Sequence, residues 1–176
     1  MPETPKYRFE FKYQLNPFQY HALRRKFKHL LAADRHAGPE GEYHIRSLYF
    51  DNIDNKALHE KLGGFLDREK IRIRIYNCSD RVIHLEKKLK HNDFSAKVRE
   101  PLTRAMTDAL LAGDPDVLNV PGKRLFLDVC RRMKTELLRP KVIVDYVREA
   151  YTYSFGNVRI TFDKQLRTGL NNTNLF

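Results

Sequence analysis

Polar and apolar residues alternate along several stretches of the chain, and the clearest stretch is "KIRIRIY" at residues 70–76. Every second residue there is isoleucine, and the residues between them are Lys70, Arg72 and Arg74. Successive side chains of a β-strand point to opposite faces, so this segment predicts one apolar face and one ladder of cations. The simplest interpretation buries the isoleucines in a core and leaves the cations in water. The alternative is that the cations line a cavity that holds a strongly negative ligand.

Other segments show the same strand-like alternation, and four show the 3.6-residue spacing of helices. The predicted strands are 7–13, 42–51, 70–76, 81–91, 94–100, 141–151 and 157–166, and the predicted helices are 17–31, 54–64, 103–113 and 122–140. Asn16, Asp54 and Thr103 are suitable N-cap residues, and Pro17 suits the first helical position. The turns are of hairpin length, which favours antiparallel pairing. The sequence therefore predicts a single α+β domain over residues 1–176.

The polar faces of the predicted strands are dominated by cations rather than by uncharged polar residues. They carry Arg8, Lys12, Lys70, Arg72, Arg74, Lys88, Lys90, Lys97, Arg99, Arg148 and Arg159. Like charges on neighbouring strands repel, so such a face is costly unless an anion compensates for it. The amphipathic helices need an apolar surface, which the other faces of the strands supply. This pattern predicts a sheet curled into a barrel, with helices outside and charge inside. Residues 142–144 are apolar on both faces, and the face taken by Arg46 is left open.

Composition agrees with a folded domain that has anionic partners. The chain has 176 residues, is 41% hydrophobic and 31% charged, and carries a formal net charge of +11. Such an excess favours nucleic acid, an anionic membrane surface or phosphate-rich small molecules. No apolar run is long enough to span a bilayer and no signal segment opens the chain, so we expect a cytoplasmic protein. Cys78 and Cys130 are isolated and predict neither a disulfide nor a zinc site.

Seven short motifs occur in an order that resembles a known family. They are "RFEFKY", "RSLYFD", "KIRIRIY", "HLEKKLK", "SAKVR", "DYVREAY" and "VRITFD". This order is similar to that in the catalytic domain of the vacuolar transporter chaperone (VTC) family of polyphosphate polymerases, within the triphosphate tunnel metalloenzymes. The resemblance implies an antiparallel β-barrel tunnel with helices packed outside. It also implies ATP and inorganic polyphosphate as substrates, and Mn²⁺ or Mg²⁺ as the metal.

The resemblance also implies roles for particular residues. Those expected to act in phosphoryl transfer are Lys12, Arg72, Arg74, Lys88, Tyr146 and Arg148. Those expected to bind phosphate are Lys12, Arg72, Arg74, Lys88, Lys97, Arg99, Arg148 and Arg159. These residue types suit the chemistry, because arginine binds phosphate oxygens as a fork and lysine acts as a compact charge. No glycine-rich phosphate loop is present, so side chains must hold the phosphates. We expect Arg72→Ala or Arg74→Ala to weaken triphosphate binding far more than folding stability.

Glu10, Glu86 and Asp163 are the carboxylates that the resemblance places nearest a metal, and an internal salt bridge is the competing interpretation for each. In the family a further strand carrying a metal-binding glutamate follows the "VRITFD" strand. The segment "QLRTGLNNTNLF" has no glutamate. We therefore expect either a C-terminally truncated fragment of the domain or a barrel that lacks its last strand, which would leave an open edge and a poorer metal site.

Three other functions compete with the polymerase. A tunnel triphosphatase would use water as the acceptor, and a non-catalytic domain would only bind polyphosphate or inositol phosphates. A nucleic-acid-binding module ranks last, because such surfaces present aromatic residues beside cations and only Tyr76 and Tyr146 share the cationic face here. We therefore expect no nucleic-acid partner. The sequence predicts no membrane span, and it leaves a membrane partner and the oligomeric state open.

Overall fold

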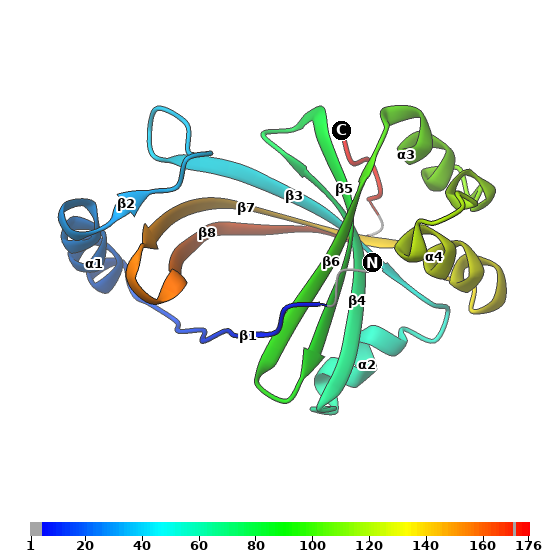
Figure 1. Ribbon diagram of the computed structural model, residues 1–176, viewed down its shortest axis with the longest axis horizontal. Coiled ribbons are helices and arrows are strands. Elements are labelled where there is room, and N and C mark those ends of the chain that lie inside the picture. The colour runs from blue at the N-terminus through cyan, green and yellow to red at the C-terminus, as the bar shows by residue number, and fades with distance from the viewer. Residues whose placement is uncertain (1–4, 171) are drawn as a thin grey trace.

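The computed structural model describes residues 5–170 and 172–176, which form one curled antiparallel sheet with four α-helices (Figure 1). The strands are β1 (Arg8–Phe9), β2 (Ala32–Ala33), β3 (Glu42–Asp51), β4 (Asp67–Tyr76), β5 (Ser79–His91), β6 (Phe94–Leu102), β7 (Arg139–Tyr153) and β8 (Val158–Leu170). The helices are α1 (Pro17–Leu30), α2 (Lys56–Leu62), α3 (Arg104–Leu111) and α4 (Arg124–Thr135), with the 3₁₀ turns η1 (Asp116–Leu118) and η2 (Phe155–Asn157). No helix in these ranges is long and apolar enough to cross a bilayer.

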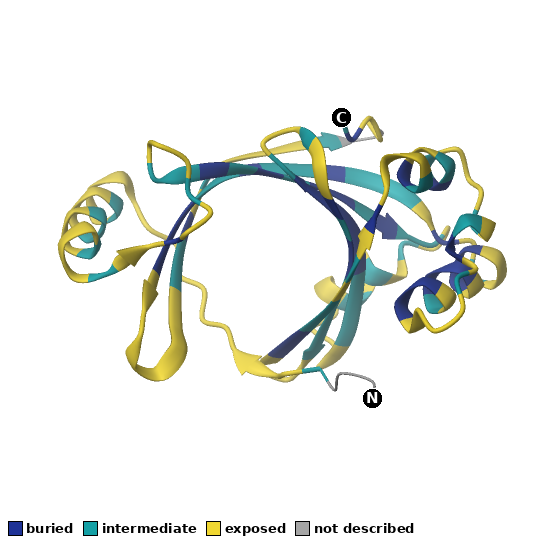
Figure 2. Cartoon of the chain, turned by 45° about the horizontal axis from the view of Figure 1, so that its top comes forward, coloured by how far each residue is buried: buried dark blue, intermediate teal, exposed yellow. Residues whose placement is uncertain are grey.

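The sheet curls into an open half-barrel. Its order is β1-β6-β5-β4-β3-β7, and β2 and β8 both pair with β7. Among the described residues no ladder joins β8 to β1 or β6, so these two edges of the sheet face each other without closing the ring (Figure 2). The predicted fold class, an antiparallel barrel-like sheet with helices outside, is confirmed.

The main core lies on the convex side of the sheet. Ile71, Ile73 and Ile75 of β4 are buried there against Leu110 of α3 and Val129 of α4. Figure 1 shows α3 and α4 together on the outside of the curl, next to β5 and β6. The isoleucines of "KIRIRIY" therefore face the helices, and the lysine and arginines between them face the concave side.

Helix α1 packs on the convex side of the other arm of the sheet. Phe27 lies 5.7 Å from Phe162 and 5.9 Å from Tyr151, measured between ring centroids. Arg24 and Tyr20 both bond to the buried carboxylate of Glu149. The predicted start of this helix is confirmed. The Asn16 side chain accepts from the backbone N–H of Gln19, the Gln19 side chain accepts from that of Asn16, and Pro17 follows the cap.

Three local predictions need correction or completion. The strand predicted over 7–13 is paired only at Arg8 and Phe9, and the side chain of Phe11 is 73% exposed.

Asp54 does not cap α2. The helix begins after Asn55, and the side chains of Asp51 and Asn52 accept hydrogen bonds from its first N–H groups. The face of Arg46 is now known, because Arg46 bonds to Asp145 on the convex side.

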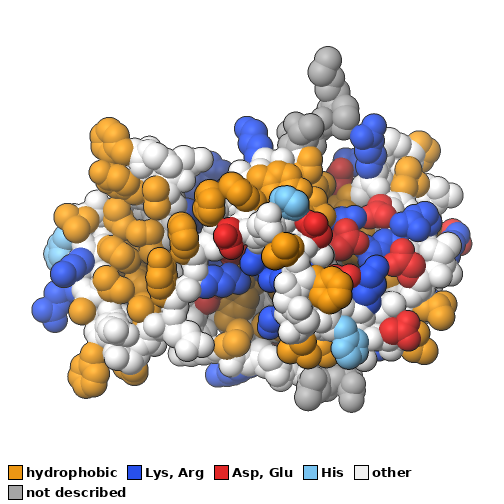
Figure 3. All heavy atoms as spheres, turned by 90° about the horizontal axis from the view of Figure 1, so that it is seen from below, with side chains coloured by type: hydrophobic (Ala, Val, Ile, Leu, Met, Phe, Trp, Pro, Cys, Tyr) orange, Lys and Arg blue, Asp and Glu red, His pale blue; other side chains and the backbone are white. Residues whose placement is uncertain are grey.

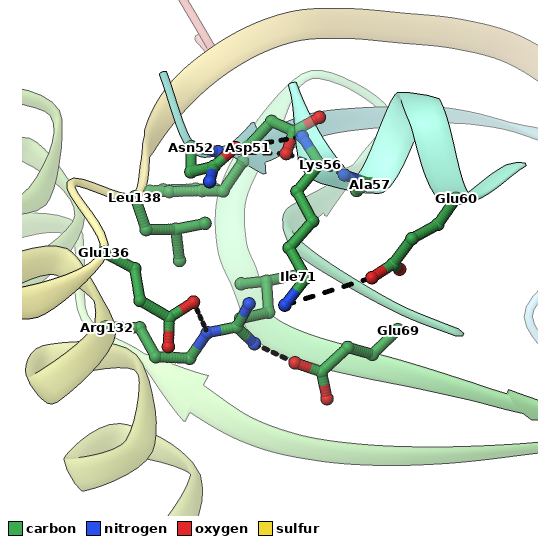
Figure 4. A pocket seen from close by; sticks show the side chains of 11 residues that line it. Asp51, Asn52, Lys56, Ala57, Glu60, Glu69, Ile71, Arg132, Glu136 and Leu138 are labelled. Carbon is green, nitrogen blue, oxygen red and sulfur yellow. Dashed lines mark hydrogen bonds and ion pairs between the residues drawn. The ribbon is translucent and has the colours of Figure 1, made fainter. Parts of the chain in front are cut away.

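A small pocket between β4, α2 and α4 also lies on the convex side. Arg132 of α4 donates to Glu69 of β4 and to Glu136 (Figure 4). Lys87 of β5 bridges Glu69 and Asp128. The cavity holds only about 20 Å³, so we interpret this cluster as a structural connection between α4 and the sheet.

Candidate functional site

Two arginines of β4 form the floor of the concave face. Arg72 donates from Nε and Nη2 to Glu86 at 2.8 and 2.6 Å, and from Nη1 to the Tyr49 hydroxyl at 2.9 Å. Arg74 donates to the Ser47 hydroxyl and the Tyr146 hydroxyl, both at 3.1 Å. Both arginines are buried, with exposed fractions of 9% and 5%. Strand pairing and these hydrogen bonds hold the two guanidinium groups at fixed positions.

Glu86 of β5 is the anion at the centre of this arrangement. It is completely buried, and it lies 3.8 Å from Arg74 Nη1 and 2.9 Å from Lys97 Nζ in addition to its bonds with Arg72. Burial alone would raise the pKa of Glu86, but Arg72, Arg74 and Lys97 lower it to about 2. Three cations around one carboxylate leave a net charge of +2 at the floor.

Lysines extend the positive charge along β4, β5 and β6. Lys70, Lys88 and Lys97 lie directly opposite one another in the strand register. Burial lowers the pKa of all three, and neighbouring cations lower it further. Lys88 is partly neutralised by Glu10, and Lys97 by Glu86. Lys70 makes no ion pair within 4.0 Å among the described residues, so this row retains uncompensated charge.

The second arm of the sheet adds two arginines and two phenols. Arg148 of β7 forms a bidentate ion pair with Asp163 of β8 at 2.6 and 2.7 Å, and its guanidinium lies 5.2 Å from the centre of the Tyr146 ring. Arg159 of β8 donates to Asp34 at 2.6 Å and to the Tyr43 hydroxyl at 2.9 Å. Burial raises the pKa of the Tyr146 and Tyr43 hydroxyls, so both are protonated donors at neutral pH.

These groups form one cationic surface on the inside of the curl. Seen from below, lysine and arginine side chains gather around a hollow in the middle of the molecule (Figure 3). The strand registers bring together six of the predicted phosphate-binding residues, Arg72, Arg74, Lys88, Lys97, Arg99 and Arg148, and also Tyr146, which was predicted to act in phosphoryl transfer. Lys12 lies in the exposed segment after β1 and outside the sheet, and Arg159 lies at the far end of β8. The roles of all the predicted site residues in binding and phosphoryl transfer stay predictions.

Several residues on this face were not among the predicted site residues. Ser47 and Tyr49 of β3 hold the two floor arginines, and Tyr43 holds Arg159. The alternation of "EYHIRSLYFD" places Tyr43, Ser47 and Tyr49 on one face, so a period-two pattern could have identified them. His84 of β5 lies opposite Arg74, and its buried Nδ1 has no hydrogen-bond partner among the described residues. Burial and the nearby Arg99 lower the pKa of His84, which keeps this imidazole neutral.

The three predicted metal ligands do not meet. Glu10 is bonded to Lys88, Glu86 to its three cations, and Asp163 to Arg148. Residues 5–170 and 172–176 contain no group of three His, Cys, Asp or Glu side chains placed to hold a metal ion. A divalent cation prefers several free carboxylate oxygens, and here each carboxylate is neutralised by a basic side chain. These residues therefore do not fit a metal centre formed by Glu10, Glu86 and Asp163 together.

Comparison with known proteins agrees with this geometry. The family model for the VTC domain matches residues 7–175. The chain belongs to the VTC domain family. Seventeen chains of known structure match it, among them a "putative adenylate cyclase" from Bacillus halodurans. That structure aligns with a TM-score of 0.52 at 14% identity, over 91% of this chain and 72% of the other, which supports the tunnel-like fold of this VTC domain. No curated protein matches the chain.

Proposed function

We propose that this VTC domain is a polyphosphate polymerase that uses ATP as its phosphate donor. The observation that supports it best is the row of cations along the concave face, which outnumber the carboxylates of Glu86 and Asp163 among them. The row runs from Lys70, Lys88 and Lys97 through Arg72 and Arg74 to Arg148 and Arg159. A linear polyanion with a charge at each repeat matches such a row better than a compact anion does.

The proposed reaction needs positioning and charge neutralisation more than covalent help from the protein. A terminal oxygen of the polyphosphate chain attacks the γ-phosphorus of ATP. The bond from that phosphorus to the oxygen that bridges it to the β-phosphate breaks, and ADP leaves. Negative charge that develops on the phosphate oxygens is stabilised by the floor arginines and by the row of lysines. In this proposal the Tyr146 hydroxyl, which contacts Arg74, donates to a phosphate oxygen.

The concave face is organised before any ligand binds. Arg72 is held by Glu86 of β5 and Tyr49 of β3. Arg74 is held by Ser47 of β3 and Tyr146 of β7. Each arginine is therefore bonded to two strands besides its own. Fixed guanidinium groups lose little side-chain entropy when phosphate binds, and they require no reorganisation during the reaction.

A second candidate is supported by the same hydrogen bonds. All three nitrogens of the Arg72 guanidinium already donate to protein acceptors. These bonds use three of its five N–H groups, which leaves two donors for a transferring phosphate. This favours a domain that binds polyphosphate or triphosphate without turning it over. Hydrolysis of triphosphate by water is a third candidate. One assay distinguishes it from polymerisation and from binding without turnover.

The test is an incubation of the purified protein with ATP and Mn²⁺, and in parallel with Mg²⁺. Long-chain polyphosphate and free phosphate are measured in the same sample. Accumulation of polyphosphate with equimolar ADP is the expected result. Free phosphate alone would replace the proposal with a triphosphatase. If neither product forms while calorimetry shows tight binding of polyphosphate, the protein is a binding domain.

Arg148→Ala provides a matched variant for this assay. Arg148 lies on the concave face and contacts the exposed Asp163, so its loss should reduce product formation without unfolding the protein. Arg131→Ala serves as its control, because Arg131 is an exposed arginine of α4 on the convex side. Equal loss of activity in the two variants would contradict a reaction on the concave face.

A further inference from the structure

A thiol, an imidazole and a carboxylate lie next to one another at the rim of the sheet, outside the cationic concave face. The Sγ atom of Cys78 is 3.5 Å from Nδ1 of His44. Nε2 of the same imidazole is 3.8 Å from Oδ2 of Asp145. Arg46 holds that carboxylate through two hydrogen bonds of 2.9 Å. In nucleophilic thiol sites a base contacts the nucleophile and a third group lies next to the base. Here the contact from His44 to Asp145 is longer than a hydrogen bond, so Asp145 acts on the imidazole through its charge.

The two-residue turn between β4 and β5 positions the thiol. Asn77 and Cys78 both have a φ of +52°, as this type of hairpin turn requires. The backbone N–H of Asn77 donates to the carbonyl of His44, and the side chain of Asn77 accepts from the backbone N–H of His44. These two bonds tie the turn to the strand that carries the imidazole. Cys78 is exposed at the tip, where a small reagent can reach it.

We propose that Cys78 is a modification site that exchanges with small-molecule disulfides, with His44 as its base and Asp145 as the residue that positions His44. Nδ1 of His44 takes the proton of the thiol, and the thiolate sulfur attacks one sulfur of the disulfide. A bond forms between Cys78 and that sulfur, and the original sulfur–sulfur bond breaks. The departing thiolate takes the proton from the imidazolium and leaves as a free thiol. The protein is thus oxidised to a mixed disulfide while half of the reagent is reduced.

The orientation of His44 agrees with this role. For Nδ1 to accept a proton, the neutral imidazole must carry its hydrogen on Nε2, and Nε2 is the nitrogen that faces Asp145. A carboxylate at that position also stabilises the imidazolium that forms. Cys130 provides a contrast within the same chain, because it lies on α4 and is buried in the core among apolar side chains. Its thiol should stay inert in the folded protein.

The first test uses the whole folded protein and oxidised glutathione at neutral pH, with the modified cysteine identified by mass spectrometry of its peptide. The expected result is a mixed disulfide at Cys78, reversed by a thiol reductant, and none at Cys130. His44→Ala should slow the exchange by about tenfold or more, because a positioned general base typically contributes at least that much. Addition of free imidazole should restore part of the rate in this variant. A merely structural role of His44 would not produce that rescue.

Three further variants keep the proposal falsifiable. His44→Gln retains a polar side chain of similar length, and its disulfide exchange should also be slow. This variant therefore tests the role of His44 even if His44→Ala fails to fold. His59→Ala removes an exposed histidine of α2 and should leave the rate unchanged. Asp145→Asn should slow the exchange by a smaller factor than loss of His44. The proposal is overturned if both His44 variants react as fast as the unchanged protein, or if Cys130 reacts as fast as Cys78.

Discussion

Replacement of Glu86 by glutamine removes the only carboxylate within 4.0 Å of Arg72 and Arg74 among the described side chains. The substitution keeps the size of the side chain and most of its hydrogen-bonding capacity. Arg72, Arg74 and Lys97 would then surround a neutral group in a buried environment, where repulsion between like charges is strong. We therefore expect Glu86→Gln to lower the free energy of unfolding at neutral pH.

The size of the effect follows from the pKa of Glu86. Folding lowers this pKa from 4.5 to about 2. At about 1.36 kcal/mol for each pH unit, the difference corresponds to about 3 kcal/mol in favour of the charged carboxylate. Removal of one partner from a buried ion pair typically costs a similar amount, about 3–5 kcal/mol. Because Glu86 is completely buried, screening by solvent does not reduce this value much.

Urea denaturation at pH 7, with and without tripolyphosphate, is the assay. Glu100→Gln is the control: Glu100 is on β6, where it pairs with the half-exposed Lys123, and this change should cost less than about 1 kcal/mol. Tripolyphosphate should stabilise the Glu86 variant at least as much as the unchanged protein, because the ligand supplies the missing negative charge. If the Glu86 variant loses no more stability than the Glu100 control, Glu86 does not stabilise the cation cluster.

The same carboxylate predicts how stability depends on pH. Since folding lowers the pKa of Glu86, its contribution is fully present above the ordinary value of 4.5 and disappears as the pH falls toward 2. The urea midpoint of the unchanged protein should therefore fall across this window. In Glu86→Gln that part of the decrease should be missing, so the two curves should converge at low pH. Curves that stay parallel would assign the acid sensitivity to other groups.

Three further predictions separate binding from folding. Arg148→Ala should weaken tripolyphosphate binding at least about tenfold in calorimetry, because a hydrogen bond to a charged group contributes about 1.5–3 kcal/mol. The control Arg131→Ala should leave the dissociation constant unchanged. Ile73→Ala should lower the free energy of unfolding by about 2–5 kcal/mol, because Ile73 is fully buried on the convex side. The affinity of the folded molecules for tripolyphosphate should stay unchanged. A large change in that affinity would contradict the separation of the two faces. Asn16→Ala should cost about 1 kcal/mol in thermal or urea unfolding by removing the N-cap of α1, and no change would show that the cap is dispensable.

Much of the sheet could be predicted because its two faces differ so sharply in chemistry. Alternation with a period of two assigned Ile71, Ile73 and Ile75 to one face and Arg72 and Arg74 to the other, and the structure confirms both assignments. The pattern is readable because the core lies on one side of the sheet only. Helices α1 and α3 were predictable for a related reason: their caps act through neighbours in sequence, as in the bond from Met106 N–H to the Thr103 side chain.

The rest depends on contacts that no local pattern contains. The alternation of "YRFEFKY" indicates a strand as strongly as other segments do, yet β1 ends at Phe9 because its ladder with β6 ends there. Glu86 looked equally suitable as a metal ligand and as a salt-bridge partner. Its role as the anchor of Arg72 became visible only when the register placed the two residues opposite each other. Arg46 was ambiguous for the same reason, since its partner Asp145 is 99 residues away.

The hydrogen bonds of Arg72 also change one expectation about mutants. From the sequence alone, Arg72→Ala should weaken triphosphate binding far more than stability. In the structure this side chain is buried and bonded twice to Glu86, so its removal leaves a buried carboxylate with fewer partners. We now expect Arg72→Ala to cost about 3 kcal/mol of stability in addition to affinity. Arg148 pairs with an exposed carboxylate on Asp163, and its removal should cost less than about 1 kcal/mol.

Parallel urea and calorimetry measurements on Arg72→Ala and Arg148→Ala compare the two arginines directly. Both variants should bind tripolyphosphate more weakly, and only Arg72→Ala should unfold at a clearly lower urea concentration. Equal stability of the two would mean that water or a shift of Lys97 compensates Glu86 when Arg72 is lost. In that case the floor of the concave face would be a binding surface alone, and the carboxylate beneath it would contribute little to holding the sheet together.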